Sequence, residues 1–79
     1  MGRELMHTTL KIEYMGRDAG ECDVVVTEGP EVSPPRPGLN THVLEACGNY
    51  LGDEYVVRSN EGGVEGALRA LKAHIESTL

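Results

Sequence analysis

Alternating apolar and polar residues predict a strand near the start of the chain. In the segment 8–14, one side is formed by three apolar residues, Leu10, Ile12 and Tyr14. A period of two residues is typical of a strand with one buried face. The apolar run 22–27 predicts a second strand, and the glycine-containing turn at 15–21 favours an antiparallel hairpin between the two.

The second strand carries three successive valines, Val24–Val26, and so places apolar side chains on both of its faces. A strand with one solvated face would instead alternate apolar and polar residues. Two explanations are open. Either both faces are covered within the chain, or Val25 lies in a contact surface with another chain.

The segment 28–38 predicts a loop, because it contains all four prolines of the chain. Proline donates no hydrogen bond to a sheet and favours extended geometry, so we expect an exposed, stiff arm. The spacing of Pro34 and Pro37 also fits a PxxP ligand. That spacing is frequent by chance, and a rigid connector is the favoured interpretation.

A first helix is predicted from Asn40 or Thr41, either of which can cap it, to about Leu51. Gly48 lies inside this segment and would cost the helix about 1 kcal/mol relative to alanine. The apolar side of this helix would be formed by residues at helical spacing: Val43, Leu44, Cys47, Tyr50 and Leu51.

The C-terminal third has the clearest pattern. A Tyr-Val-Val run predicts a strand at 54–58, a glycine turn follows at 59–63, and Gly62 suits the cap of a second helix that begins near Val64. At about 100° per residue, the apolar positions of this helix form one stripe. The stripe consists of Val64, Ala67, Leu68, Leu71 and Ile75.

These elements predict an α+β fold in the order β-β-α-β-α. We expect one small domain, 1–79, in which a three-stranded sheet with a hairpin packs against two helices. Within it, 28–38 is the proline-rich loop and 54–77 the strand-turn-helix unit. A chain of this size without Phe or Trp has little room for a deep pocket, which favours a recognition surface over an enclosed site.

The charge balance limits the partners of the chain. It has 13 acidic residues against 7 Lys and Arg, a net charge of −6. A negative field repels phosphate backbones, so direct nucleic-acid binding is disfavoured and a basic protein surface is favoured. No run approaches the roughly 20 apolar residues of a membrane span, and no signal peptide is visible. We therefore expect a cytoplasmic protein in which Cys22 and Cys47 are reduced thiols.

No group of residues predicts catalysis, a cofactor or a metal site. The Gly62-Gly63 loop lies between a strand and a helix, where backbone N–H groups could hold an anion, but it lacks the Lys and Ser or Thr of a phosphate loop. The His and Cys residues show no metal-binding spacing, and the acidic surroundings of both thiols oppose an activated thiolate. We predict that the chain is not an enzyme.

Carboxylates concentrate around the predicted hairpin turn and the proline loop. We expect them, with one arginine of the loop, to bind a basic protein surface. The predicted partner-binding residues are Asp18, Glu21, Asp23, Glu28, Glu31 and Arg36. The simplest alternative is that these charges only make the chain soluble.

The preferred function is therefore a non-enzymatic interaction module. Small acidic chains without catalytic residues are typical of inhibitors from phages and mobile elements, including mimics of nucleic acids. A structural or oligomerising subunit is the alternative, for example a homodimer joined at sheet edges through the valine-rich strand. A further alternative is small-ligand or anion binding at the Gly62-Gly63 loop.

Overall fold

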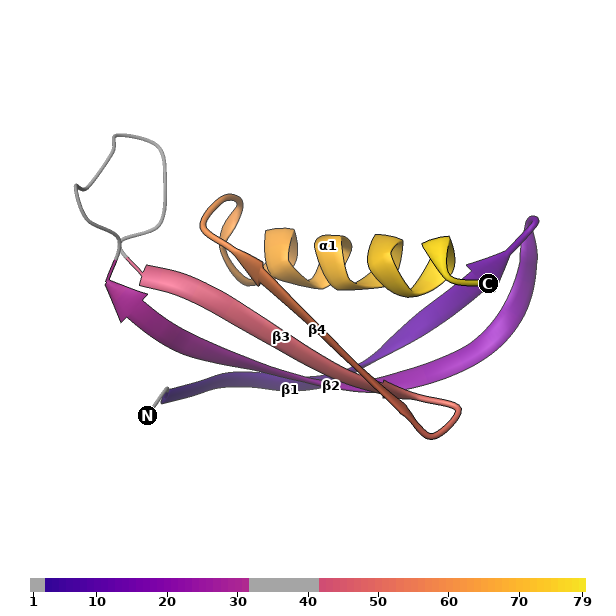
Figure 1. Ribbon diagram of the computed structural model, residues 1–79, viewed down its shortest axis with the longest axis horizontal. Helices are drawn as coiled ribbons and strands as arrows, with labels where there is room; N and C mark the ends of the chain where they lie inside the picture. Colours follow the sequence, from indigo (N-terminus) through magenta and orange to yellow (C-terminus); the bar gives the residue numbers. More distant parts are fainter. Residues whose placement is uncertain (1–2, 32–41) are drawn as a thin grey trace.

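The computed structural model describes residues 3–31 and 42–79, which form a four-stranded sheet and one helix (Figure 1). The sheet is an antiparallel meander in the order β1-β2-β3-β4, and the C-terminal helix lies across one of its faces. The elements are β1 (Arg3–Tyr14), β2 (Arg17–Glu31), β3 (His42–Tyr50), β4 (Asp53–Ser59) and α1 (Gly63–Ser77).

The predicted β-β-α-β-α order is wrong, because the segment expected to form the first helix is the strand β3. Its buried residues follow a period of two: Leu44, Ala46, Gly48 and Tyr50. The apolar residues that suggested a helix, such as Leu44 and Cys47, lie on opposite faces of the strand. The apolar residues of this short segment fit both the helical period of about 3.6 residues and the strand period of two. Pairing with β2 and β4 makes the segment a strand.

At Gly48, the helix packs directly against the backbone of the sheet. A β carbon at this position would lie 2.7 Å from Sγ of Cys22 and 2.9 Å from Cδ2 of Leu71. A side chain there would push α1 away from β3. The glycine that argued against a helix is thus required by helix–sheet packing.

The hydrophobic core lies between α1 and the covered face of the sheet. The predicted stripe of α1 is confirmed, since Ala67, Leu71 and Ile75 are fully buried and Val64 and Leu68 pack against them. The sheet contributes aliphatic residues and one tyrosine, whose hydroxyl donates to the carbonyl oxygen of Ala19. These sheet residues are Ile12, Cys22, Val24, Val26, Leu44, Ala46 and Tyr50.

The first hairpin is longer than the sequence predicts. Its turn consists only of Met15 and Gly16, and the rest of the predicted turn, 17–21, is already strand. The pairing register shifts between Lys11 and Glu13, and Gly20 there has φ 106°. The turn-forming residues of 17–21 therefore mark an irregularity inside a long strand.

The predicted loop 28–38 is wrong in its first part, because Glu28 and Glu31 belong to β2. The register of β2 with β3 shifts between these two residues, which suits the proline between them. The rest of this segment, including the PxxP spacing, lies outside the described residues.

The β1–β2 and β3–β4 hairpins each have a two-residue turn whose backbone is left-handed. Met15 has φ 53° and Leu51 has φ 52°, and each precedes a glycine with positive φ. Such turns match the twist of paired strands, but they favour Asn, Asp or Gly at both positions. Here the first position holds a bulky side chain that is 83% exposed at Met15 and 81% exposed at Leu51. Neither side chain gains burial that offsets its backbone strain.

We predict that Met15→Asn and Leu51→Asn each stabilise the fold. Asparagine tolerates the left-handed region, so each change should raise the free energy of unfolding by about 0.5–1 kcal/mol. Thermal denaturation should show a rise in Tm of about 2–8 °C per site. Met15→Ala is the matched control. It removes the same exposed side chain, but alanine lacks the tolerance of asparagine for the left-handed region. A Tm that does not rise in either Asn variant would contradict this account of the turns.

Candidate functional site

The structure separates the predicted partner-binding residues into two groups. Asp18, Glu21 and Asp23 lie on the half of β2 next to the β1–β2 turn, whereas Glu28 and Glu31 lie at its other end. Asp18 and Glu28 are ten residues of strand apart, about 33 Å, whereas Asp23 and Glu28 are five apart, about 17 Å. The predicted residues therefore extend along β2 and do not gather at the turn. Glu28 is half-buried.

The sixth predicted residue, Arg36, lies outside the described residues. Of the five that the structure describes, Asp18 and Glu21 lie nearest the turn.

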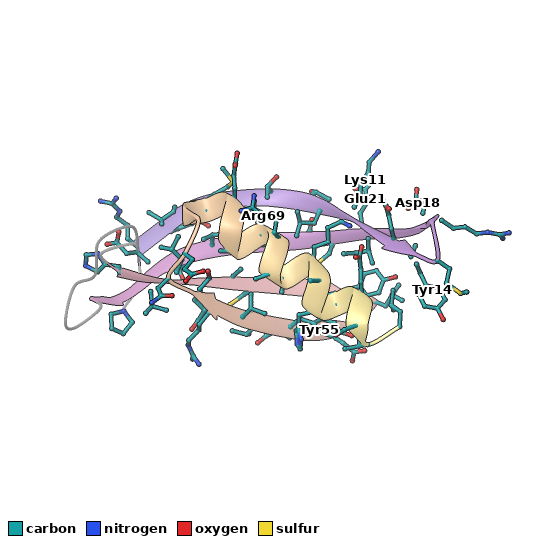
Figure 2. All side chains as sticks on the ribbon, turned by 90° about the horizontal axis from the view of Figure 1, so that it is seen from above. Lys11, Tyr14, Asp18, Glu21, Tyr55 and Arg69 are labelled. Atoms are coloured by element: carbon teal, nitrogen blue, oxygen red, sulfur yellow. The ribbon has the colours of Figure 1, made fainter. Side chains whose placement is uncertain are left out.

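Around the β1–β2 turn, an exposed apolar tip adjoins paired carboxylates. We call this the hairpin-turn surface and define it as Glu13, Tyr14, Met15, Asp18 and Glu21, all of which are exposed. Figure 2 shows Tyr14 and Asp18 projecting from the end of the hairpin, with Lys11 and Glu21 further back along the strands. The sequence predicted Asp18 and Glu21 of this surface as partner-binding residues, but not Glu13.

The apolar member of this surface, Met15, is not apparent from the sequence. The residue type gives no signal for a left-handed turn. Only the turn position, one residue before Gly16, could have indicated it.

The two carboxylates nearest the tip face each other across the hairpin. Glu13 pairs in register with Asp18, and like charges directly opposite in a sheet destabilise it. One oxygen of Asp18 accepts a hydrogen bond from the Gly20 N–H at 2.9 Å. Both carboxylates line a shallow cleft of about 270 Å³ together with Lys11 and Gly16.

The C-terminal turn of α1 holds this end of β1 in place. The backbone N–H of Glu13 donates to Oε2 of Glu76 at 2.9 Å, and the same oxygen accepts from Nζ of Lys72 at 2.7 Å. These bonds lower the pKa of Glu76, first through Lys72 and then through the backbone of Glu13. The hairpin-turn surface is thus built on a fixed strand end.

A second candidate surface is the sheet face that α1 does not cover. Val24 and Val26 are fully buried under the helix, while Val25 points to the other face and is half-buried. Among the described residues, nothing covers that face. Of the three successive valines, two therefore lie on the face that α1 covers and one on the face that it does not.

We call this uncovered face the open face. We define it by the residues of β2, β3 and β4 that alternate with the core: Asp23, Val25, Thr27, Glu45, Cys47, Asn49, Glu54, Val56 and Arg58.

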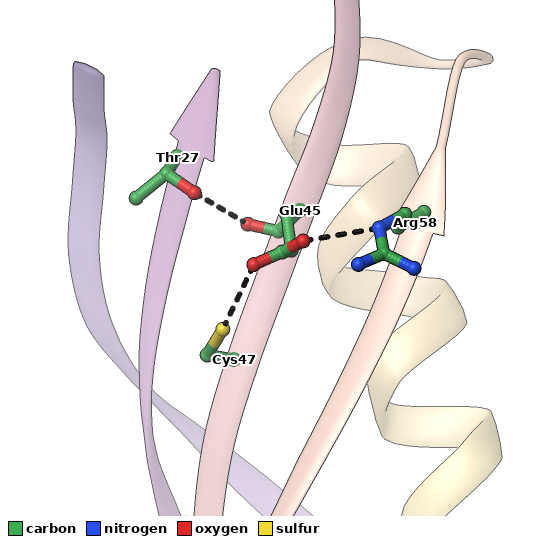
Figure 3. Close-up of polar contacts among 4 residues, drawn as sticks. All are labelled: Thr27, Glu45, Cys47 and Arg58. Carbon is green, nitrogen blue, oxygen red and sulfur yellow. Dashed lines mark hydrogen bonds and ion pairs between the residues drawn. The ribbon is translucent and has the colours of Figure 1, made fainter. Parts of the chain in front are cut away.

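Glu45 is the centre of the polar contacts on the open face (Figure 3). Its Oε2 accepts from Nε of Arg58 at 3.1 Å, and its Oε1 accepts from Sγ of Cys47 at 3.6 Å. Its carbonyl oxygen accepts from the hydroxyl of Thr27 at 3.5 Å. The Arg58 side chain is 72% exposed, so this ion pair contributes at most about 1 kcal/mol and leaves other donors of the guanidinium free.

Neither thiol has the features of a nucleophile. Burial raises the pKa of Cys22 in the core. Burial also raises the pKa of Cys47, and the adjacent Glu45 carboxylate raises it further. His74 stacks edge-on against Tyr55 on the helix side of the sheet, with ring centroids 5.7 Å apart, whereas Cys47 lies on the opposite face.

The Gly62-Gly63 loop forms a shallow depression of about 380 Å³ at the start of α1. Gly62 is the helix cap, as predicted, with φ 74°. The nearest cation is Arg69, which lines the depression together with the carboxylate-bearing Glu61. Arg58, which precedes this loop in the sequence, pairs with Glu45 on the open face.

Within residues 3–31 and 42–79, no three His, Cys, Asp or Glu side chains gather into a group that could hold a metal ion. The one helix described there is too short and too polar to cross a membrane. Comparisons with protein-family models, with curated proteins and with solved structures find no match for the chain.

We predict that Glu45→Gln increases the reactivity of Cys47. Removing the carboxylate beside Sγ lowers the thiol pKa, so a larger fraction is thiolate at about pH 8 and alkylation should be severalfold faster. The rate can be followed by mass spectrometry with iodoacetamide. Cys22 is an internal control, because its burial keeps it slow in both proteins. An unchanged rate at Cys47 would show that burial alone sets its pKa.

Proposed function

We propose that the chain is a small, non-enzymatic protein-interaction module that binds a basic protein surface through its hairpin-turn surface. The observation that carries this proposal is Met15. It is a bulky apolar side chain, 83% exposed, held in a left-handed turn beside two facing carboxylates. The left-handed backbone at Met15 and the facing carboxylates of Glu13 and Asp18 each lower the folding stability. Binding energy from a partner would compensate for both costs.

The chemistry of this surface defines the partner. An exposed methionine is flexible and polarisable, and it fits apolar pockets of varied shape. Glu13 and Asp18 beside it would accept hydrogen bonds from an arginine or lysine on the rim of such a pocket. A partner cation between them would relieve their mutual repulsion. We therefore expect an apolar pocket with a basic rim.

The charge of the whole chain supports the same partner. A net charge of −6 would accelerate encounter with a basic surface and make the affinity fall with salt. An inhibitor that occupies the basic groove of a nucleic-acid-binding protein would use these properties. Such a role needs only the carboxylates of the hairpin-turn surface, since Glu28 and Glu31 lie toward the other end of β2. Action in the cytoplasm is part of this proposal, and the free thiols support it.

A comparison of two turn variants tests this proposal. Met15→Asn and Leu51→Asn relieve the same backbone strain, but only the first alters the hairpin-turn surface. Immobilised wild-type protein should retain a basic protein from host lysate, and Met15→Asn should lose it while Tm rises. Leu51→Asn should retain it with the same gain in Tm.

Charge provides the second arm of the same experiment. Asp18→Lys should abolish retention, whereas Glu65→Lys, an equal change on the exposed side of α1, should not. Retention by wild type should also weaken as salt rises. The proposal is wrong if Met15→Asn and Asp18→Lys retain the same proteins in the same amounts as wild type.

A further inference from the structure

The open face is built of three parallel rows of residues that run across the strands. On β2, β3 and β4 the middle row is apolar and consists of Val25, Cys47 and Val56, which are cross-strand neighbours. The row continues on β1 as the exposed His7, which would face its own copy across an axis along this row. Val56 is 38% exposed, and the other two are half-buried. This row is the part of the open face that would gain most from being covered.

The two rows that flank the apolar row differ in charge. On one side, the row consists of Thr27, Glu45 and Arg58. On the other side, the row consists of Asp23, Asn49 and Glu54, all exposed. Along β2, β3 and β4, the members of one row therefore lie four residues from the members of the other.

A two-fold axis along the apolar row would place these two rows against each other. Each strand would then lie over its own copy, running in the opposite direction, as in an isologous sheet-on-sheet contact. Arg58 would face the Glu54 of the second copy, which gives two opposite-charge pairs per dimer. Glu45 would face Asn49, and Thr27 would face Asp23, so each carboxylate would meet a hydrogen-bond donor.

A two-fold axis in the other direction, along the strands, would bring like charges together across the interface. With the axis parallel to β3, Asp23 would face Glu54 and Glu45 would face its own copy. Like charges brought together across an interface cost several kcal/mol. The pattern on the open face thus matches a second copy of the same chain, in one of the two orientations.

We infer that the open face is a homodimer interface with its two-fold axis along Val25, Cys47 and Val56. The occupant of the uncovered sheet face is a second copy of this chain. The inference is independent of the proposed function, because the end of the β1–β2 hairpin bends toward the side of the sheet that carries α1 (Figure 1). A dimer would leave both β1–β2 turns, with Met15 at each tip, free and pointing in opposite directions.

Sedimentation equilibrium of the full chain tests the interface directly. Concentrations from about 10 µM to about 1 mM cover the affinity expected for a small interface. Wild type should show a monomer–dimer equilibrium. Arg58→Glu and Glu54→Arg should each weaken the dimer at least tenfold, because each replaces two attractive pairs with two repulsive ones.

Two combinations should restore the dimer. The double variant Arg58→Glu/Glu54→Arg restores opposite charges at both pairs. An equimolar mixture of the two single variants should form a heterodimer more tightly than either forms a homodimer, since every pair across that interface is again opposite in charge. Circular dichroism and Tm confirm that each variant is folded. Glu65→Arg and Arg69→Glu on α1 are matched controls, which change net charge by the same amounts outside the face.

Cross-linking through Cys47 tests the position of the axis. The Cys47 of each copy would face the other across the axis, and packed sheets lie about 10 Å apart. A bismaleimide with a spacer of about 8 Å should therefore join two chains through these thiols at about pH 8. Cys47→Ser should abolish the covalent dimer, because Cys22 is fully buried.

Three results would overturn the inference. The first is a wild-type chain that remains monomeric at about 1 mM. The second is a dimer that the double variant and the mixture fail to restore. The third is a dimer that Glu65→Arg weakens as much as Glu54→Arg does.

Discussion

The packing of α1 against β3 at Gly48 is the contact on which the rest of the structure depends. The absence of a side chain there lets Leu71 lie against the strand and bury the aliphatic core between helix and sheet. One helix can cover only one face of a four-stranded sheet. The same contact that builds the core therefore leaves the other face, with its row of Val25, Cys47 and Val56, without cover in the described part of the chain.

The sequence predicted an element correctly where the spacing of its apolar residues fits a helix or a strand, but not both. The stripe of α1 extends over three turns and has no strand interpretation, so its buried residues were identified correctly. The segment of β3 is shorter, and its apolar residues fit both a helix and a strand. Pairing with β2 and β4 decides its structure, and that information lies outside the segment. Gly48 misled the prediction because its reason, the approach of Leu71, is a tertiary contact.

The candidate surfaces show the same limit. Asp18, Glu21 and Asp23 are close in sequence, so their grouping could be predicted. Glu28 was grouped with them on the assumption of a loop, and a continuous strand instead carries it about 33 Å from Asp18.

The grouping of Glu45 with Arg58, and of Asn49 with Glu54, depends on strand register, which a single sequence does not provide. The structure thus adds what the sequence lacks, namely which charges share a face and which backbone positions are strained.

In the proposed dimer, one sheet face packs on the helix and the other on a second copy. Amide NMR spectra recorded at rising protein concentration distinguish this arrangement from a monomer. The shifts should grow with concentration and centre on Val25, Cys47 and Val56, with the exposed side of α1 unchanged. Spectra that do not depend on concentration, or shifts centred on α1, would contradict this arrangement.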